Sequence, residues 1–314
     1  MKRHIYEGNF DPTWYAERTD RNIGWITREE QQMLLSKTVG IAGCGGMGGL
    51  IAQILLRLGI GHIKIADCEV FDVSNINRQF GALQTTVGKS KAQETARLLR
   101  ETADDTKLTV YEDGITEETV DDFLSQCDIV CDEIEFWAVG SRILLHQRAR
   151  ALGVSVFNCN TVGWRTHLFF FTPESGTMEA CLGMEYEAAR NLQEKIAERR
   201  ATPDEIQIVM DAVIRGLIPI LPEYSADTEK YSTVETAKRR LFEEGKATII
   251  ATNPPMASGF VANRVLMHLL ADSPIPRTIV APPAMPGYLL FDAALMETAI
   301  VCEAWWNDTR EVSL

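Results

Sequence analysis

A glycine-rich turn between two short apolar segments is the first place in this sequence where residue type and spacing predict chemistry. Gly43, Gly45 and Gly48 satisfy the pattern G-x-G-x-x-G, and Gly46 adds a fourth glycine to the turn. Glycine permits a tight turn and a close backbone approach to phosphate, and the N–H groups that open the following helix carry partial positive charge. The pattern predicts a nucleotide or dinucleotide site without distinguishing the two.

An acidic residue follows at the position where ribose hydroxyls would lie. Residues 38–42 predict a strand, 50–58 a helix and 62–66 a second strand, which ends at Asp67. These segments form a complete β-α-β unit. An acid at the end of the second strand can accept hydrogen bonds from ribose, so we assign that role to Asp67 and expect Glu69 to contact the nucleotide as well.

Cationic and amide side chains come soon after the acid. The run Asn75-Ile-Asn-Arg78-Gln79 precedes Lys91, which lies near the start of a predicted helix. A dinucleotide does not require these groups, whereas a triphosphate requires fixed cations and amides around its oxygens. The sequence therefore favours a triphosphate, and an NAD(P)-linked oxidoreductase remains as a weaker alternative.

Predicted strands and helices alternate through the first half of the chain. Strands are expected at 107–111, 128–132, 155–158 and 167–172, and helices at 29–36, 89–100, 119–126 and 141–152. This alternation predicts an α/β fold with a Rossmann-like, doubly wound, mostly parallel sheet that antiparallel strands extend.

We expect the chain to divide into an N-terminal arm at 1–27, a nucleotide-binding core at 28–184, a helical insertion at 185–250 and the C-terminal part of the same core at 251–314. Within the insertion, 187–200 and 236–244 have a helical period. A short strand at 249–251, a helix at 257–270 and closing strands at 287–292 and 295–301 complete the predicted elements.

The glycine turn, Asp67, the run from Asn75 to Gln79 and Lys91 resemble, in order and spacing, the signature of the ThiF/MoeB/HesA family, which shares its fold with the adenylation domains of ubiquitin-activating enzymes. The resemblance covers most of 18–175 and, more weakly, 253–295. It implies an ATP- and Mg²⁺-dependent adenylyltransferase that acts as a homodimer. The implied acceptor is a carboxylate, from a ubiquitin-like protein, a peptide or a small acid.

The resemblance also implies roles for individual residues. Arg78 and Lys91 would bind the β- and γ-phosphates, while Asn75 and Gln79 would order the site. Arg21 lies where the family has an arginine finger that reaches into the neighbouring subunit. The alternative for Arg21 is an ordinary surface arginine.

Two departures from the family pattern concern the metal and the acceptor. Glu135 occupies the position of an aspartate that binds Mg²⁺, and it keeps the carboxylate with a longer reach. Phe136 and Trp137 replace a small polar neighbour, which suggests a reshaped acceptor pocket. Cys181 is the sole candidate for a transfer thiol after the core, so the adenylate is expected to be attacked by an amine, amide or hydroxyl instead.

Two further functions stay open. The segment 75–83 looks similar to the relatives that cyclise threonylcarbamoyladenosine in tRNA, and these also need no transfer cysteine. A degenerate scaffold that binds nucleotide without catalysis is the other, because Glu135 and Phe136 depart from the pattern.

Composition limits the partners. The formal net charge of −13 and the pI of about 4.9 argue against nucleic acid and anionic membranes, because neutralisation of phosphate supplies most of such affinity. The sequence contains no apolar run of the ~20 residues that span a bilayer. The seven scattered cysteines are typical of buried thiols in a reducing compartment. We therefore expect a cytoplasmic protein without a structural zinc.

Overall fold

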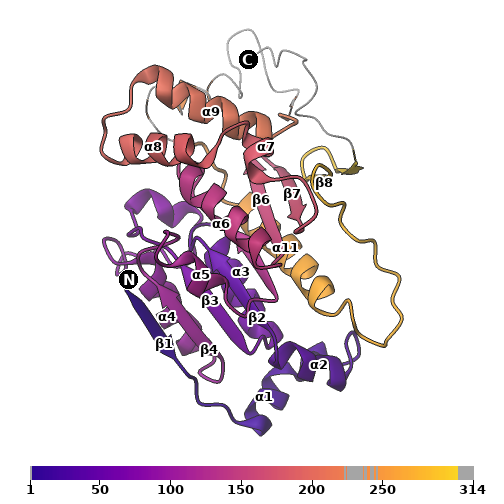
Figure 1. Ribbon diagram of the computed structural model, residues 1–314. Coiled ribbons are helices and arrows are strands. Elements are labelled where there is room, and N and C mark those ends of the chain that lie inside the picture. Colours follow the sequence, from indigo (N-terminus) through magenta and orange to yellow (C-terminus); the bar gives the residue numbers. More distant parts are fainter. Residues whose placement is uncertain are drawn as a thin grey trace.

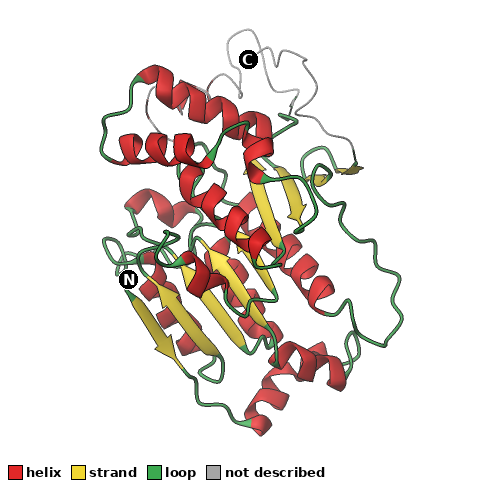
Figure 2. Ribbon diagram, viewed as in Figure 1, coloured by secondary structure: helices red, strands yellow, loops and turns green. Residues whose placement is uncertain are grey.

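The computed structural model describes residues 2–222, 224, 236, 239–240, 244 and 247–302. Its strands are β1 (Arg3–Tyr6), β2 (Thr38–Ala42), β3 (His62–Ala66), β4 (Lys107–Tyr111), β5 (Ile129–Asp132), β6 (Val156–Val162), β7 (Arg165–Phe171), β8 (Tyr288–Asp292) and β9 (Glu297–Val301). Within this part of the chain they form one nine-stranded sheet in the order β1-β4-β3-β2-β5-β6-β7-β8-β9 (Figure 2).

The centre of the sheet is parallel and its two sides are antiparallel. Strands β4, β3, β2, β5 and β6 run in the same direction, β1 pairs antiparallel with β4, and β7, β8 and β9 continue the sheet antiparallel from β6. Every residue of β2 is buried, as expected for a strand covered on both faces. This arrangement confirms the predicted α/β fold class.

Helices cover both faces of the sheet. They are α1 (Pro12–Thr19), α2 (Arg28–Leu35), α3 (Gly48–Leu58), α4 (Lys91–Thr102), α5 (Val120–Leu124), α6 (Val139–Ala151), α7 (Met178–Leu182), α8 (Tyr186–Ala197), α9 (Pro203–Leu217) and α11 (Asn253–Leu269). Buried side chains of α3, α4 and α11 form one core cluster, and those of α5, α6, α7 and α9 form the other, on the opposite face. None of the described helices is long and apolar enough to cross a membrane.

The parallel strands give the molecule two distinct ends. Figure 1 shows α1 and α2 beyond the amino ends of these strands, while α8 and α9 lie at the end to which the strands point. Ligands of doubly wound sheets bind outside the carboxyl ends of the strands. The helical insertion is therefore at the same end of the sheet as the expected nucleotide site.

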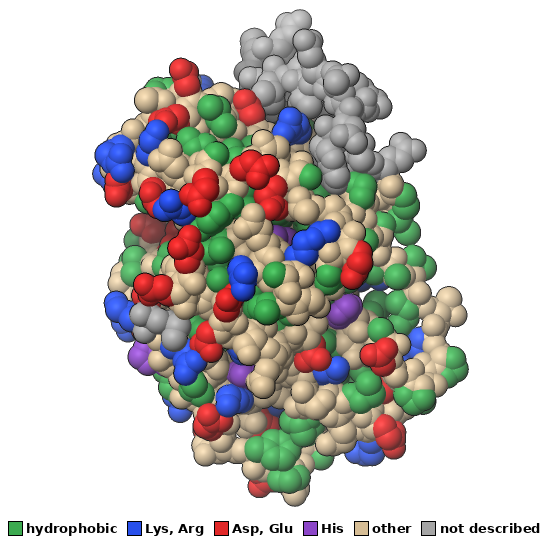
Figure 3. All heavy atoms as spheres, viewed as in Figure 1, with side chains coloured by type: hydrophobic (Ala, Val, Ile, Leu, Met, Phe, Trp, Pro, Cys, Tyr) green, Lys and Arg blue, Asp and Glu red, His purple; other side chains and the backbone are tan. Residues whose placement is uncertain are grey.

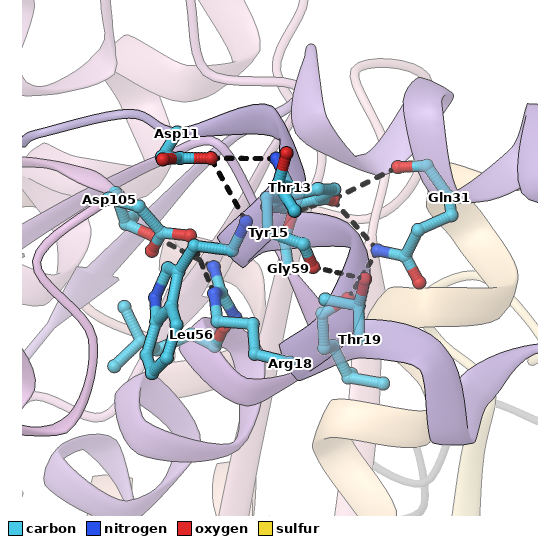
Figure 4. Close-up of polar contacts among 12 residues, drawn as sticks. Asp11, Thr13, Tyr15, Arg18, Thr19, Gln31, Leu56, Gly59 and Asp105 are labelled. Carbon is cyan, nitrogen blue, oxygen red and sulfur yellow. Dashed lines mark hydrogen bonds and ion pairs between the residues drawn. The ribbon is translucent and has the colours of Figure 1, made fainter.

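The residues before the glycine-turn unit, predicted as an arm, form regular elements that contact the core. Strand β1 pairs with β4, and α1 is attached to the far end of α3 by a group of polar contacts (Figure 4). The hydroxyl of Tyr15 donates to the carbonyl of Gly59 at 2.8 Å and accepts from Gln31 Nε2 at 2.8 Å. Arg18 Nε donates to Asp105 Oδ2 at 2.6 Å.

The predicted capping box at the start of α2 is confirmed. The side chain of Thr27 accepts from the backbone N–H of Glu30, and the carboxylate of Glu30 accepts from the N–H of Thr27. Gly59 also ends α3 in the left-handed conformation, with φ of 92°. Both helix ends could be predicted because the residues that form them lie close together in the sequence.

The predicted strand at 249–251 is wrong. Those residues form a loop and turn that lead into α11, which begins at Asn253, four residues before the predicted start. Pro254 and Pro255 lie in the first turn of α11, where proline fits because its missing N–H would lack a partner there anyway. The predicted helix at 236–244 lies largely outside the described residues.

Candidate functional site

The glycine turn connects β2 to α3 and is closed by its own backbone. Gly43 has a φ of +103°, and a Cβ atom there would lie 2.2 Å from the carbonyl oxygen of Glu133. A Cβ atom at Gly48 would lie 1.9 Å from the carbonyl oxygen of Gly43. Any larger residue at either position would disrupt the turn. Glycine is required at Gly48 by the turn's own backbone, and at Gly43 by the segment that follows β5.

The other two glycines face the predicted phosphate ligands. A Cβ atom at Gly45 would lie 3.7 Å from Gln79 Nε2, and one at Gly46 would lie 3.4 Å from Arg78 Cγ. Helix α3 begins two residues later, and the side chain of Met47 does not cap it. Uncapped N–H groups at a helix start favour an anion. The turn therefore presents backbone donors toward the side chains of the β3–α4 loop.

Asp67 attaches the end of β3 to this turn. Its carboxylate accepts hydrogen bonds from the backbone N–H of Cys44, at 2.6 Å, and from that of Glu69, at 2.8 Å. Burial raises the pKa of Asp67, and the ammonium of Lys91 opposes the shift. Each carboxylate oxygen has a second lone pair, so the assignment of Asp67 to ribose stays a prediction that the geometry permits.

Lys91 is a buried cation at the first turn of α4. Its Nζ lies 2.6 Å from Glu69 Oε2, and the residue is 5% exposed. Burial works to lower the pKa of Lys91, but the carboxylates of Asp67, Glu69 and Glu135 outweigh it, so the pKa is raised. The ammonium is therefore charged at neutral pH, with Glu69 as its partner.

Arg78 lies on the loop between β3 and α4, beside the glycine turn. Its Nη1 donates to Asn77 Oδ1 at 3.1 Å. Burial lowers the pKa of Arg78, while the nearby carboxylates of Glu135 and Glu69 raise it. Asn75 shapes the loop, because its Oδ1 accepts from the N–H of Asp72 at 3.0 Å. Gln79 is buried, and its Oε1 has no hydrogen-bond partner among the described residues.

The C-terminal part of the core closes over the same loop. Asn77 Nδ2 donates to the carbonyl of Ile249 at 3.2 Å. The hydroxyl of Ser258 on α11 lies 3.2 Å from the carbonyl of Met47, to which it donates. A Cβ atom at Gly46 would also lie 3.5 Å from Pro254 Cβ. The first turn of α11 therefore supports the glycine turn, and no sequence signal beyond the resemblance at 253–295 pointed to this contact.

Glu135 lies in the loop between β5 and α6 and faces the cations of the site. Burial raises the pKa of Glu135, repulsion by Glu69 adds to the shift, and Lys91 opposes it. Glu135 Oε1 accepts from the N–H of Phe136 at 3.1 Å, and the residue keeps a solvent-exposed side. The charge of Glu135 also acts to raise the pKa values of Arg78 and Lys91.

The donor set fits Mg²⁺ bound together with a nucleotide. Among the described residues, no group of three or more His, Cys, Asp and Glu side chains could hold a metal by itself. Mg²⁺ usually takes one or two protein carboxylates and completes its shell with water and substrate phosphates. The exposed carboxylates of Glu69 and Glu135 are consistent with that mode of binding, with Glu69 already paired to Lys91.

Sequence reasoning missed a buried polar network directly behind Glu135. Asp132 Oδ2 lies 3.0 Å from Arg142 Nε, 2.9 Å from His146 Nε2 and 3.0 Å from Asn158 Nδ2. Burial alone would raise the pKa of Asp132, but Arg142 and His146 outweigh it and the pKa is lowered. The available signal was the spacing of Arg142 and His146, which lie four residues apart and therefore on one face of the predicted helix.

Arg21 is remote from the glycine turn of its own chain. It is exposed in a short 3₁₀ helix (Asp20–Asn22), where the neighbouring Asn22 Nδ2 donates to the carbonyl of Leu58 at 3.4 Å. Leu58 ends α3, whereas the turn precedes the start of α3, and eleven helical residues span roughly 16 Å. Arg21 cannot contact the phosphates bound by its own subunit.

The environment of Cys181 does not favour a reactive thiolate. The residue is fully buried, and its thiol donates to the carbonyl of Gly216 at 3.1 Å. Burial raises the pKa of Cys181, which disfavours the thiolate that transfer chemistry needs. Its surroundings agree with the expectation that the thiol serves packing.

A family model decides which family the fold represents, because the model of the ThiF family matches residues 19–301. The chain belongs to the ThiF family. The match includes the glycine turn, the β3–α4 loop, the Glu135 loop and α11, and it confirms the family predicted from the sequence. ThiF membership also agrees with the mixed sheet, whose parallel core carries the site.

Curated relatives match part of the chain. The adenylyltransferase and sulfurtransferase MOCS3 of Dictyostelium discoideum is 27% identical over 186 residues, which are 58% of this chain and 43% of that protein. The tRNA threonylcarbamoyladenosine dehydratase of Bacillus subtilis is 33% identical over 103 residues, 33% of this chain and 41% of that protein. The chain therefore spans less than half the length of either relative.

A solved structure matches nearly the whole fold. The crystal structure of Escherichia coli MccB with AMPCPP and MccA has a TM-score of 0.59 at 14% identity, covering 93% of this chain and 73% of that one. At this identity the likeness concerns the fold alone.

Proposed function

We propose that this protein is an ATP-dependent adenylyltransferase that activates a carboxylate as an acyl-adenylate and releases pyrophosphate. The observation that carries the proposal is the position of two cations at this end of the sheet. Arg78 lies beside the glycine turn, with its Cγ 3.4 Å from a Cβ atom placed on Gly46, and the buried ammonium of Lys91 lies 2.6 Å from Glu69 Oε2. Two cations and an accessible carboxylate near the start of α3 suit a magnesium-bound triphosphate. Family membership and the names of the matched relatives point in the same direction.

The chain's own residues supply positioning and charge. In the reaction, an acceptor carboxylate oxygen forms a bond to the α-phosphorus of ATP, and the bond from that phosphorus to the bridging oxygen of pyrophosphate breaks. Arg78 and Lys91 neutralise the charge that collects on pyrophosphate, and the donors of the glycine turn hold the phosphates. No general base is required because the nucleophile is already ionised. Asp67 and Glu69 orient the ribose side of the nucleotide.

Glu135 is the residue that would hold Mg²⁺. A bound magnesium ion supplies charge neutralisation between phosphate oxygens. Burial raises the pKa of Glu135, repulsion by Glu69 adds to the shift, and a bound cation would offset both effects. Glu69 is paired with Lys91, and the ammonium of Lys91 would also bind the incoming phosphates.

The acceptor is a carboxylate of a peptide, a ubiquitin-like protein or a small acid. The matched crystal structure holds MccB together with MccA, and the MOCS3 relative is named a sulfurtransferase as well as an adenylyltransferase. The buried Cys181 favours an amine, amide or hydroxyl rather than a thiol as the group that attacks the adenylate. We expect the reaction to take place in the cytoplasm, since all cysteines of the described residues are free thiols.

A homodimer would bring Arg21 of one subunit to the nucleotide of the other. Large apolar side chains are exposed on both surfaces that such a dimer joins. Trp25, near Arg21, is 86% exposed, and Val73, Ile76 and Phe80 of the β3–α4 loop are 65%, 44% and 52% exposed. Exposed apolar groups next to a site mark interaction surfaces, and Arg21 is out of reach of its own site.

A direct test of adenylation is a mass-spectrometric screen. Purified protein with ATP and MgCl₂ is incubated with peptides, ubiquitin-like proteins and small acids, and products are searched for an added AMP and for pyrophosphate. The proposal predicts both from one acceptor class, and it predicts their loss in Arg78→Ala. Stoichiometric ATP binding without pyrophosphate from any acceptor would instead support the non-catalytic scaffold.

The dimer has a separate test by subunit mixing. Arg21→Ala and Arg78→Ala are each expected to be inactive alone. Mixed dimers would restore about a quarter of wild-type activity, since half of the dimers would be mixed and each would have one intact site. No recovery after subunit exchange would contradict an arginine supplied in trans.

The tRNA dehydratase alternative rests on the resemblance of segment 75–83 and on the 33% identity over 103 residues to the Bacillus subtilis enzyme. The net charge of −13 weighs against it, because tRNA binding depends on phosphate neutralisation. On the face drawn in Figure 3, basic and acidic side chains are interspersed and form no continuous basic stripe. Salt-dependent tRNA binding at low micromolar protein would favour this alternative.

Bound nicotinamide would favour an oxidoreductase.

A further inference from the structure

The loop that carries Glu135 is followed by a helix that does not cap itself. The N-cap residue of α6 is Ala138, which provides no side-chain hydrogen bond to the first turn. A helix normally satisfies its second or third N–H through a cap side chain, at a benefit of roughly 1 kcal/mol. The start of α6 must therefore find its acceptor elsewhere.

That acceptor comes from the helical insertion. Gln193 of α8 accepts from the N–H of Ser141, the third residue of α6, at 2.9 Å through its Oε1. Its Nε2 donates back to the hydroxyl of Ser141 at 3.0 Å. The first bond does what an N-cap side chain does for the N3 N–H, from a residue 52 positions away in the sequence, and the second holds the Gln193 amide against Ser141.

The two helices approach closely at this point. A Cβ atom at Gly140 would lie 2.8 Å from the Cα of Arg190 on α8. Phe136 and Trp137, which follow Glu135, stack with ring centroids 4.5 Å apart. They pack against the same buried cluster as Leu192 and Ile196 of α8. The loop after Glu135 thus lies against the insertion.

The loop before Glu135 is held from the opposite side. Ile134 donates its N–H to Asp132 Oδ1 at 3.1 Å, and its carbonyl accepts from Arg142 Nη2. Arg142 belongs to the first turns of α6, the same turns that Gln193 caps. A shift of α6 would therefore move both the backbone before Glu135 and the backbone after it.

We infer that Gln193 is a positioning residue for Glu135: the insertion caps α6 and thereby holds the magnesium carboxylate at the correct distance from the phosphates. The inference rests on the proposed function, since it assigns a task to the same site. It accounts for a feature the sequence did not explain, namely why a charged helical insertion follows the core at the end of the sheet where the site lies.

The test measures how strongly Mg²⁺ improves the binding of AMPCPP, by calorimetry in MgCl₂ and in EDTA. Gln193→Ala is expected to reduce the improvement roughly fivefold, the value of one lost cap, with unchanged affinity in EDTA. It should also speed amide exchange at 133–141. Gln193→Glu keeps an acceptor for the Ser141 N–H and should restore both readouts. Gln207→Ala, the same substitution at a surface glutamine of α9, should match the wild type.

Three outcomes would overturn the inference. One is an unchanged magnesium effect in Gln193→Ala, another is an equal loss of affinity in EDTA, and the third is failure of Gln193→Glu to rescue. If Gln193→Ala does not fold, Ser141→Ala removes the hydroxyl partner alone and should give a weaker drop in the same direction, whereas no drop counts against the inference. A wild-type protein that binds no AMPCPP would refute the proposed function itself, so the two failures are distinguishable.

Discussion

Two groups of charged and polar side chains lie at opposite ends of the parallel strands, and they differ in what their charges do. At the amino end, Arg18 is paired with Asp105, and Glu30 is paired with Arg277. At the carboxyl end, Glu135 and Asp67 have raised pKa values, and Arg78 has a side-chain partner only in the neighbouring Asn77 among the contacts of the described residues. The first group stabilises the fold, while the second retains unfavourable charge that a ligand would relieve.

The largest expected contrast comes from removing one arginine at each end. Arg78→Ala should weaken AMPCPP binding with Mg²⁺ by about 100-fold, because it removes a phosphate cation from a partly buried site. Calorimetric titration measures the change. The free energy of unfolding should stay within about 0.5 kcal/mol of the wild type, since few contacts are lost. An Arg78→Ala variant that is destabilised but binds AMPCPP normally would contradict this assignment.

At the other end the effects should be reversed. Arg18 Nε lies 2.6 Å from Asp105 Oδ2, and its Nη1 donates to the carbonyl of Leu56 at 2.8 Å. Arg18→Ala leaves a buried carboxylate without its cation and should cost about 3 kcal/mol of unfolding free energy. Urea denaturation measures this cost. The AMPCPP affinity of Arg18→Ala should equal that of the wild type. A fall in affinity would show that the two ends of the sheet are coupled.

The contribution of Glu30 to the free energy of unfolding is expected to depend on pH. Hydrogen bonding to Arg277 lowers the pKa of Glu30 to about 2, and Ser273 and the N–H of Thr27 contribute as well. A carboxyl group with a lowered pKa stabilises the fold above its ordinary pKa of 4.5, and this stability is lost as pH falls toward about 2. Glu30→Gln should cost about 2 kcal/mol at pH 7. Denaturation at pH 7 and pH 3 should show the cost shrinking, and a constant cost would contradict the assignment.

The smallest expected effect concerns two lysines two residues apart. Lys91 is 5% exposed, while the side chain of Lys89 is 57% exposed and lies 3.7 Å from Glu94. Lys89→Ala should change neither unfolding free energy nor AMPCPP affinity by more than about 0.5 kcal/mol, because exposed ion pairs contribute little. The same measurements on Lys91→Ala should show a clear loss of affinity. Equal effects would remove Lys91 from the site.

Local patterns were sufficient for the elements nearest the glycine turn. The strand bounds at 38–42, 62–66 and 107–111 agree with β2, β3 and β4, because short apolar runs there are ended by glycine or acidic residues. The glycine turn, Asp67 and Lys91 were found for the same reason, as their spacing lies within one β-α-β unit and the helix that follows it. The resemblance added the role of Glu135.

Contacts between distant segments could not be predicted. The cap that Gln193 provides to α6, the contact of Asn77 with Ile249 and the pairing of β1 with β4 each join residues separated by tens of positions or more. Hydrophobic periodicity does not encode such partners, because a polar side chain looks the same in sequence whether it meets solvent or another helix. The proline pair that opens α11 misled the prediction because proline also ends strands.

A crystal structure with AMPCPP and MgCl₂ would test the central claim most directly. The account predicts the triphosphate over Gly45 and Gly46, with Arg78 and Lys91 within hydrogen-bonding distance of its β- and γ-phosphate oxygens and the metal bound to Glu135. A nucleotide bound elsewhere, or phosphates from which Arg78 and Lys91 both point away, would contradict it.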